Sequence, residues 1–320
     1  MALQSSGQIK FSEINTELGR TATLLHSLSD SSDGTYATIN TQNAVADRPD
    51  TTQPHAISEW FSYDHSLSSY TSLKFLKLSG SSQAAKAEGQ STFLTNADDF
   101  SYTAWYRIDE TSEATQHLFS LSKAATSGND QLFFMYNGNS ERLMVRYRKA
   151  GTFHQRYVSL SQTTNTAVTG VGTSGWQSNN RGNVNSDGFC MLTYTYDASE
   201  AVAATGIKMY WNDTEITVTN GSSNNLQSGI DYGSVNIGDL ASSGTFNANC
   251  FNGGIDEVKM YKRVLSGSDI TALYNSGVPT DSATAGVTAD LVGEYDFETN
   301  GNNKATGFPN LTVTGTLDSY

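Results

Sequence analysis

From about residue 70 onward, the chain is a succession of short runs in which apolar and polar side chains alternate. Alternation with a period of two places one set of side chains on each face of an extended strand. Short segments rich in Gly, Asn and Ser separate the runs, as at Asn212-Asp213. Such a chain is expected to fold into antiparallel sheets that bury one face each. The predicted strands are 73–78, 100–107, 117–121, 131–136, 142–148, 153–160, 189–196, 207–211, 215–218, 235–238, 255–264 and 291–297.

The composition agrees with a β protein and excludes two classes of function. The chain holds 40 Ser, 37 Thr, 16 Tyr and 14 Phe, residues that favour strands and turns over helices. Its net charge of −13 argues against a protein that neutralises phosphates, so we expect no nucleic-acid partner. No apolar run approaches the roughly 20 residues of a membrane span, so we expect no membrane insertion.

One helix is predicted late in the chain. Ser266 and Asp269 form a capping-box-like start, Ile270 and Leu273 supply an apolar face, and Gly277 ends the helix. The predicted fold is therefore all-β: a two-sheet antiparallel jelly-roll sandwich with one short edge helix. We place this domain at residues 66–320, behind a small irregular region at 1–65.

The first 65 residues carry two copies of one short pattern. Phe11-Ser12-Glu13-Ile14 is matched by Ile57-Ser58-Glu59-Trp60. The first copy predicts a short strand through residue 11, then a short helix with Ser12 as N-cap and Gly19 as C-cap. The stretch between the copies is polar, so we expect the region to gain order by docking on a partner rather than to be a disordered leader. The predicted docking residues are Ile9, Phe11, Ile14, Leu18, Ile57, Trp60 and Phe61.

Several segments resemble the laminin-G-like (concanavalin A-like) jelly rolls, in the order that this family shows. FNGGIDEVKMYKRVLSGSDITALYNSG at 251–277 resembles the family's G-x-I-D-E-V strand and the helix after it. DGFCMLTYTYD at 187–197 is similar to its T-Y-D strand, with Phe189 where Trp is usual, and GIKMYWND at 206–213 and VNIGDL at 235–240 follow. The resemblance covers about 70–277 and implies the fold. It leaves the function open, because members include lectins, adhesins, hydrolase modules and structural domains.

The start of the chain resembles a second group of proteins. SSGQIKFSEI at 5–14, with ISEW later, is similar to the leader of structural proteins of tailed bacteriophages. The first residues also lack the basic and apolar segments of a signal peptide, so we expect a virion location. The resemblance implies a non-enzymatic capsid decoration, neck or tail appendage. Its expected partners are other virion proteins, further copies of itself with a trimer as the first expectation, and a host surface polysaccharide.

Glu294, Asp296 and Glu298 form the E-x-D-x-E pattern of laminarinase-type glycoside hydrolases. On a strand, the three carboxylates would share one face, where they could divide the nucleophile and acid roles. We favour the alternative that they are solvent-facing residues of a structural strand, since the hydrolases carry the motif in mid-domain on a cleft strand. The alternative functions are thus a laminarinase-type glycoside hydrolase and a bacterial surface lectin.

Two segments are candidates for binding a glycan or a subunit. Strand 142–148 places its arginines, including Arg146 and Arg148, opposite its apolar residues, which suits sulfate or carboxylate groups or simply a solvated face. The loop 169–186 carries an aromatic platform flanked by amides, which suits a sugar or a subunit contact. Its candidate residues are Trp176, Asn179, Asn180 and Arg181.

Neither the cysteines nor the histidines form a metal-binding pattern. Cys190 and Cys250 are expected to be two buried thiols, and a disulfide between them stays open. We expect no cofactor and no transition metal. Calcium is common in the resembled family, but no DxDxDG loop is present, so Asp130, Asp197 and Asp256 are the carboxylates left for such a site.

Overall fold

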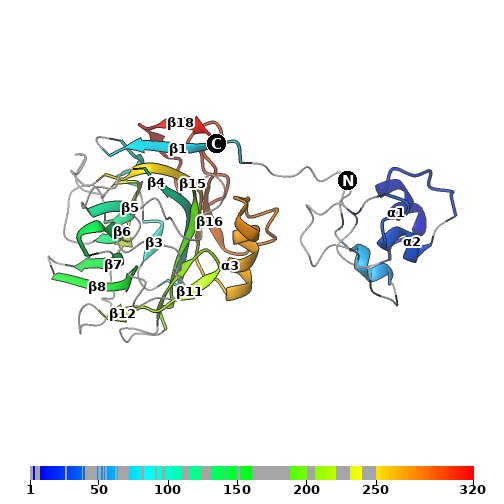
Figure 1. Ribbon diagram of the computed structural model, residues 1–320, viewed down its shortest axis with the longest axis horizontal. Coiled ribbons are helices and arrows are strands. Elements are labelled where there is room, and N and C mark those ends of the chain that lie inside the picture. Colours follow the sequence, from blue (N-terminus) through cyan, green and yellow to red (C-terminus); the bar gives the residue numbers. More distant parts are fainter. Residues whose placement is uncertain are drawn as a thin grey trace. The chain divides into compact units, whose positions relative to one another are not determined.

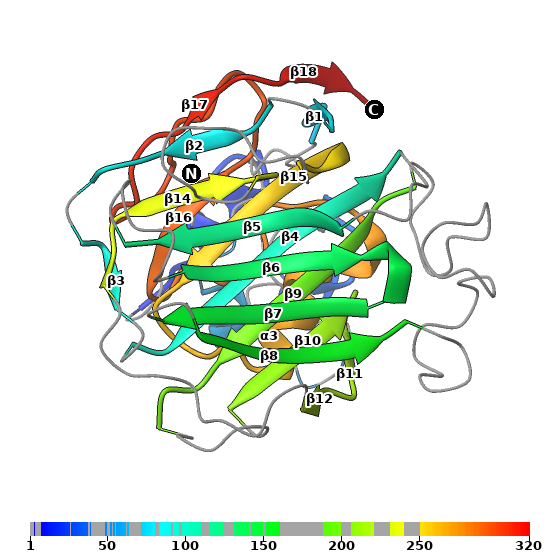
Figure 2. The ribbon, with the colours of Figure 1, turned by 90° about the vertical axis from the view of Figure 1, so that its left-hand side faces the viewer.

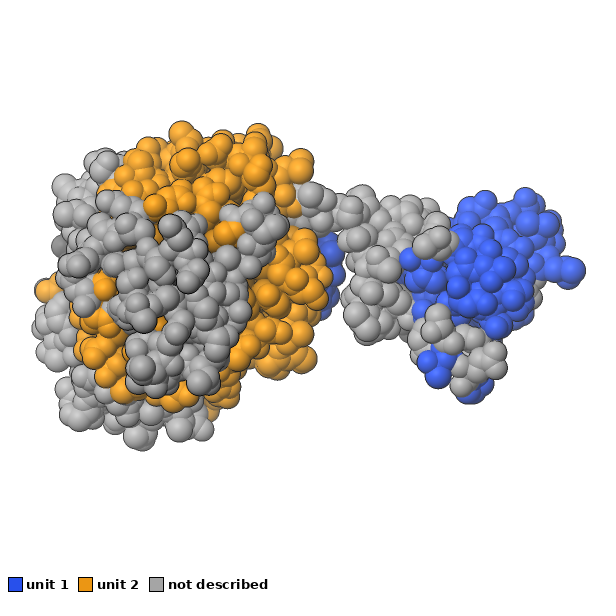
Figure 3. Space-filling view, viewed as in Figure 1, with its two compact units in different colours: residues 1–71, 283–286 blue, residues 72–282, 287–320 orange. Residues whose placement is uncertain are grey.

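A computed structural model describes residues 8–25, 27–37, 56–61, 72–80, 83–90, 92–95, 98–109, 115–123, 131–140, 142–149, 152–160, 188–199, 206–220, 231–239 and 250–320, with single positions 3, 39, 49, 52, 54 and 63. The chain divides into two compact units, coloured in Figure 3. Unit 1 is 1–71 with 283–286, and unit 2 is 72–282 with 287–320. Among the described helices, none is long and apolar enough to cross a membrane.

The structure confirms each predicted alternating run as a strand of unit 2, with shifts of a few residues at the strand ends. Six short strands, β2, β3, β12, β13, β17 and β18, were not among the predicted runs. The strands are β1 Lys74–Ser79, β2 Ala85–Ala87, β3 Leu94–Thr95, β4 Phe100–Ile108, β5 Thr115–Ser122, β6 Gln131–Asn137, β7 Arg142–Lys149, β8 Thr152–Ser159, β9 Cys190–Tyr196, β10 Ile207–Trp211, β11 Thr214–Ile216, β12 Thr219–Asn220, β13 Asp231–Tyr232, β14 Ser234–Ile237, β15 Asn252–Tyr261, β16 Leu291–Tyr295, β17 Thr312–Val313 and β18 Thr316–Ser319.

Most of these strands form two large antiparallel sheets, packed as a sandwich (Figures 1 and 2). The back sheet has the order β11-β10-β9-β4-β15-β1-β18, with β16 paired to β15. The front sheet has the order β12-β8-β7-β6-β5-β14-β2-β17, and β13 with β3 forms a small third sheet. The predicted all-β jelly-roll sandwich with few helices is confirmed.

One apolar cluster fills the space between the two sheets, and a pair of its tyrosines is hydrogen-bonded across that space. Leu143, Val145 and Tyr147 of β7 belong to this cluster. The hydroxyl of Tyr147 bonds to that of Tyr194 on β9 in the opposite sheet. A buried phenol needs such a partner, because leaving its hydroxyl unsatisfied is costly. Burial raises the pKa of Tyr194 well above its ordinary value, so this bridge stays neutral.

The G-x-I-D-E-V segment has a local geometry that explains its residues. At Gly253, φ is +152°, and a Cβ atom would lie 1.9 Å from the carbonyl oxygen of Arg107. After Asp256 the pairing of β15 with β4 slips at a bulge, and Glu257 takes a left-handed φ of +48°. The bulge places Glu257 beside Lys259, and their buried side chains pair at 2.6 Å.

The predicted helix is α3, Gly267–Tyr274, followed by a 3-10 turn η5, Asn275–Gly277. Ser266 is its N-cap and accepts from the backbone N–H of Asp269, as predicted. The helix ends at Asn275, with φ of +44°, two residues before the predicted Gly277. Tyr274 stacks on Trp105 of β4 with ring centroids 5.8 Å apart, so α3 packs on the outer face of the back sheet.

The described residues of unit 1 include three short helices, α1 Phe11–Glu17, α2 Leu28–Ser32 and η2 Ile57–Trp60. A further short 3-10 helix, η3 Gly138–Ser140, is described in unit 2. The two copies of the sequence pattern have the same cap: Glu13 accepts from the N–H of Lys10, and Glu59 accepts from the N–H of Ala56, both at 2.6 Å. The predicted strand through residue 11 and the predicted N-cap Ser12 are therefore wrong. Because the glutamate satisfies the N–H two residues before the serine, the helix begins earlier, and Gly19 follows its end at φ +70°.

The apolar residues of unit 1 form a small core of their own. Ile9, Ile14, Leu18, Trp60 and Tyr63 are all buried, and Trp60 meets Tyr63 edge to face with ring centroids 5.1 Å apart. The sequence predicted that this region gains order by docking on a partner, and that docking stays a prediction. The structure adds that the two matched patterns pack against one cluster, so each copy buries the other's apolar residues.

Candidate functional site

Strands β5 to β8 of the front sheet lie nearest the viewer in Figure 2. The outer face of this sheet carries the arginines of β7 and is the strongest candidate for a binding site. Because Leu143, Val145 and Tyr147 enter the core, the alternating residues Arg142, Arg146 and Arg148 lie on the opposite face of the strand. This is the arrangement that the sequence predicted. We call the outer face of β6, β7 and β8 the arginine face.

Beneath the arginines lies an apolar strip that the sequence analysis missed. Phe133 and Met135 of β6 form a cluster with Met144 of β7, and Tyr157 of β8 packs against it. Met135 is the register partner of Met144, and Met144 is that of Tyr157, so the strip crosses three strands. The signal was present in the run LFFMY at 132–136, which is apolar at every position and thus predicts a strand buried on both faces.

Polar groups of the arginine face are held in place by their neighbours. The Arg146 Nε donates to Oε1 of Gln155 at 3.0 Å, and the Arg142 guanidinium lies 3.9 Å from the ring centroid of Tyr157. Burial lowers the pKa of Arg146 from its ordinary value. Fixed guanidinium groups over aromatic and thioether side chains can recognise an anion attached to an apolar ring.

The loop candidates Trp176, Asn179, Asn180 and Arg181 lie outside the described residues, so their binding role stays a prediction.

The predicted docking residues of unit 1 differ in how much of them a partner could reach. Ile9, Ile14, Leu18 and Trp60 are buried in the unit's own core. Ile57 and Phe61 are half-buried beside it, whereas Phe11 is 45% exposed. Docking through unit 1 stays a prediction, and the buried residues would support it by holding the unit together.

The three carboxylates of the E-x-D-x-E pattern do not share one strand face. The strand β16 ends at Tyr295, and Phe297 has a left-handed φ of +53°, which breaks the alternation between Asp296 and Glu298. The expectation that these residues are solvent-facing is also wrong, because Glu294 and Asp296 are only 6% and 7% exposed.

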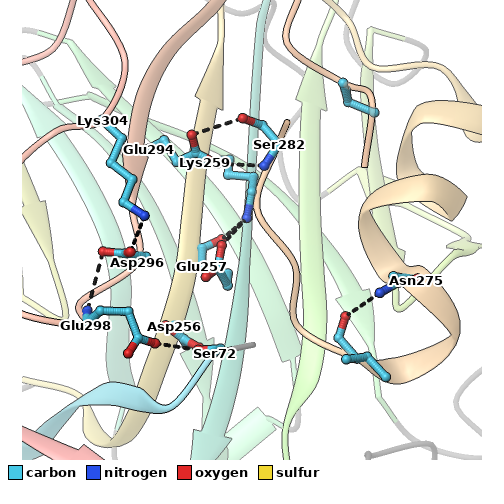
Figure 4. Close-up of polar contacts among 12 residues, drawn as sticks. Ser72, Asp256, Glu257, Lys259, Asn275, Ser282, Glu294, Asp296, Glu298 and Lys304 are labelled. Carbon is cyan, nitrogen blue, oxygen red and sulfur yellow. Dashed lines mark hydrogen bonds and ion pairs between the residues drawn. The ribbon is translucent and has the colours of Figure 1, made fainter. Parts of the chain in front are cut away.

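Each carboxylate instead binds a group of the surrounding fold (Figure 4). Glu294 accepts from the backbone N–H and the hydroxyl of Ser282, at 2.7 and 2.9 Å. Asp296 pairs with Lys304. Glu298 accepts from the N–H groups of Leu73 and Lys74, at 2.7 and 3.2 Å. The acidic side chains thus join the C-terminal segment to the start of β1 and to residue 282.

A second buried carboxylate, Asp256, lies beside them; the sequence analysis named it only as a candidate calcium ligand. Asp256 is fully buried and accepts from the hydroxyls of Ser72 and Tyr320, both at 2.5 Å. Burial, with the charge of Glu257 as the next cause, raises the pKa of Asp256 well above its ordinary value. These contacts hold the first and last residues of unit 2 to the same strand, β15.

The remaining sequence candidates concern metals and thiols. In the part of the chain that the structure describes, no group of three or more His, Cys, Asp or Glu side chains could hold a metal ion. Asp197 accepts from the N–H and hydroxyl of Ser199, while Asp130 lies outside the described residues. Cys190 and Cys250 are both buried free thiols, which confirms the first of the two expectations and excludes the disulfide.

Several solved structures are similar to part of this chain at low sequence identity. Solved structures with similar folds include the CBM40 module of a Ruminococcus gnavus IT-sialidase (16% identity over 63% of this chain and 96% of that one, TM-score 0.41). Another is the same module bound to alpha2,3 sialyllactose (15% identity over 64% of this chain and 100% of that one, TM-score 0.41). A third is the K499G mutant of the NanB sialidase from Streptococcus pneumoniae (16% identity over 58% of this chain and 27% of that one, TM-score 0.39). No curated protein matches the sequence.

The family model of the concanavalin A-like lectin/glucanases superfamily, Laminin_G_3, matches residues 79–271, which is more than half of the chain. That range runs from the end of β1 into α3 and includes the whole arginine face. The chain belongs to this superfamily.

Proposed function

We propose that this protein is a non-enzymatic surface protein of a tailed-phage virion whose jelly roll binds acidic host glycans. The arginine face carries the proposal: three guanidinium groups stand on one strand face above an apolar strip, in a chain whose net charge is −13. Membership of a superfamily named for lectins and glucanases supports a carbohydrate ligand. The phage origin is supported by the resemblance of SSGQIKFSEI and ISEW to phage leader sequences.

The chemistry of the face favours sugars that carry carboxylate or sulfate. A guanidinium fork binds such groups bidentately, which a lysine cannot do. The ring of Tyr157 and the amide of Gln155 add a surface for sugar C–H groups and a hydrogen-bonding partner for hydroxyls. A neutral glucan offers no group that pairs with the arginines, so we expect it to bind weakly or not at all.

Calorimetric titration of the full chain tests the proposal. The probes are alginate for carboxylate, a sulfated galactan for sulfate, sialyllactose for a terminal carboxylate, and dextran as a neutral control. We expect at least one acidic probe to bind, more weakly at high salt, and dextran to give no heat. A wild-type protein that binds none of the acidic probes would overturn the glycan proposal.

The variant Arg146→Gln/Arg148→Gln locates the binding. Each lost hydrogen bond to a charged group is worth about 1.5–3 kcal/mol, so the double variant should bind at least about tenfold more weakly. The matched control is Lys77→Gln/Lys208→Gln, which removes two charges from exposed pairs of the back sheet. Equal losses in both variants would show a general charge effect and not a site.

The virion role and the absence of catalysis have their own tests. Particles assembled with a chain lacking residues 1–65 should fail to acquire the protein, and particles that still acquire it would contradict attachment through this region. Glucans and agars incubated with the protein should release no reducing sugar. Sugar release that disappears in Glu294→Gln would favour the glycoside hydrolase instead.

A further inference from the structure

The three guanidinium groups of the arginine face come from one strand, β7, and therefore form a row along it. Arg142, Arg146 and Arg148 lie on the side of the strand opposite its buried core residues, and Met144 takes the remaining position between the first two. A strand rises about 3.3 Å per residue, so Arg146 and Arg148 lie about 7 Å apart along the backbone, and Arg142 and Arg146 about 13 Å apart. The row is thus several times longer than one sugar ring.

The neighbouring strands add no positive charge at the level of each arginine. The register partners on β6 and β8 are uncharged: Asn137 and Ser159 for Arg142, Phe133 and Gln155 for Arg146, and Gln131 and Phe153 for Arg148. A ligand that lies across the strands therefore meets one cation of the row. A ligand that lies along β7 meets all three.

Arg142, at one end of the row, is positioned to accept an anion. Its guanidinium lies 3.9 Å from the ring centroid of Tyr157. Within the described part of the chain, that guanidinium has no hydrogen-bond or ion-pair partner. Stacking engages the flat face of a guanidinium and leaves its N–H donors at the edge. A carboxylate or sulfate can therefore bind Arg142 without displacing a protein contact.

We propose that the row binds an internal stretch of a linear acidic polysaccharide whose chain runs along β7. Arg146 and Arg148 bind acidic groups of neighbouring sugars, and Arg142 binds a further acidic group of the same chain. This inference rests on the proposed glycan binding and names its ligand class, a polymer rather than a terminal acidic sugar. After the first contact, each further contact is intramolecular, so affinity rises with the length of the ligand.

Calorimetric titration of the full chain with oligosaccharides of graded length tests the proposal. The probes are oligomannuronates and sulfated galacto-oligosaccharides of two, four and six sugars, with sialyllactose and hexaglutamate for comparison. In at least one series, wild type should bind the hexasaccharide at least about tenfold more tightly than the disaccharide. Arg142→Gln should remove this gain and keep the disaccharide affinity, because the disaccharide reaches only Arg146 and Arg148. The retained disaccharide affinity also shows that the variant is folded.

The matched control is Lys208→Gln, which removes one charge from an exposed pair of the back sheet and should keep the gain with length. Equal affinity for both lengths, a gain that survives Arg142→Gln, or an equal loss in the two variants would overturn the polymer site. Hexaglutamate that binds as tightly as the hexasaccharide would also overturn it, in favour of an acidic protein segment. Binding of sialyllactose without a gain with length would refute only this inference, whereas no binding of any acidic glycan would refute the proposed function as well.

Discussion

Trp60→Ala distinguishes a core residue from a docking anchor. Trp60 is fully buried against Tyr63 and the three other buried apolar residues of the unit 1 core. Removing a buried tryptophan costs about 3–5 kcal/mol. A single core in a unit of this size rarely supplies more than about 3–5 kcal/mol in total. We therefore expect the substitution to unfold unit 1 as a whole, while unit 2 keeps its own core.

Limited proteolysis followed by mass spectrometry measures this outcome. The Trp60→Ala protein should be cleaved throughout residues 1–71 at protease concentrations that leave wild type intact, and a resistant fragment beginning near Ser72 should remain. Leu25→Ala is the matched control, because a 92% exposed side chain contributes less than about 0.5 kcal/mol to folding. If Trp60→Ala resists the protease as wild type does, Trp60 is not part of a core and the small autonomous unit is refuted.

Three further predictions concern charged side chains of unit 2. Lys259→Met leaves Glu257 buried without its ammonium partner, so it should lower the free energy of unfolding by about 3–5 kcal/mol in urea titrations. Adding Glu257→Gln should recover most of that loss. An unchanged urea midpoint in Lys259→Met would contradict the pairing. Glu294→Gln should lower that free energy by about 1–3 kcal/mol through its weakened bonds to Ser282, with no change in sugar release; a variant as stable as wild type would show that these bonds do not hold the segment. For Asp269, burial raises the pKa, but hydrogen bonds from Arg263 and Ser266 outweigh it and lower the pKa to about 2. The folded pKa is thus depressed below the ordinary 3.8, so this stabilisation is present above about pH 4 and is lost as the pH falls toward 2. Melting temperatures of wild type and Asp269→Asn should therefore converge at pH 2, and a constant difference would contradict the pairing.

The sandwich could be predicted from sequence because its strands carry a period-two pattern on which the fold depends. On β7, the alternation of arginines with Leu143, Val145 and Tyr147 correctly predicted which face is buried. The strip of Phe133, Met135 and Met144 escaped this reasoning, because an apolar run without alternation does not say what its second face meets. The short strands β17 and β18 escaped it too, since two to four residues carry too little pattern.

The carboxylates of the E-x-D-x-E pattern show a different limit. Alternating residues lie on one face of a strand only as long as the backbone stays extended. Here Phe297 adopts a left-handed φ, so the backbone is no longer extended between Asp296 and Glu298. The role of Glu257 depends on a β-bulge, which could not be predicted from the sequence. In unit 1, both copies of the apolar pattern could be seen in the sequence. Their contact with each other joins residues more than 40 positions apart, and local sequence patterns do not predict such a long-range contact.

Methionine-methyl NMR of the full chain tests most directly whether acidic glycans bind the arginine face. Among the six methionines, Met135 and Met144 lie in the strip beneath the arginines, whereas Met209 and Met260 lie between the sheets. During titration with the acidic oligosaccharide that binds most tightly, the Met135 and Met144 signals should shift and saturate with the calorimetric dissociation constant, and those of Met209 and Met260 should stay in place. Saturable binding that leaves Met135 and Met144 unmoved would contradict a glycan site on this face.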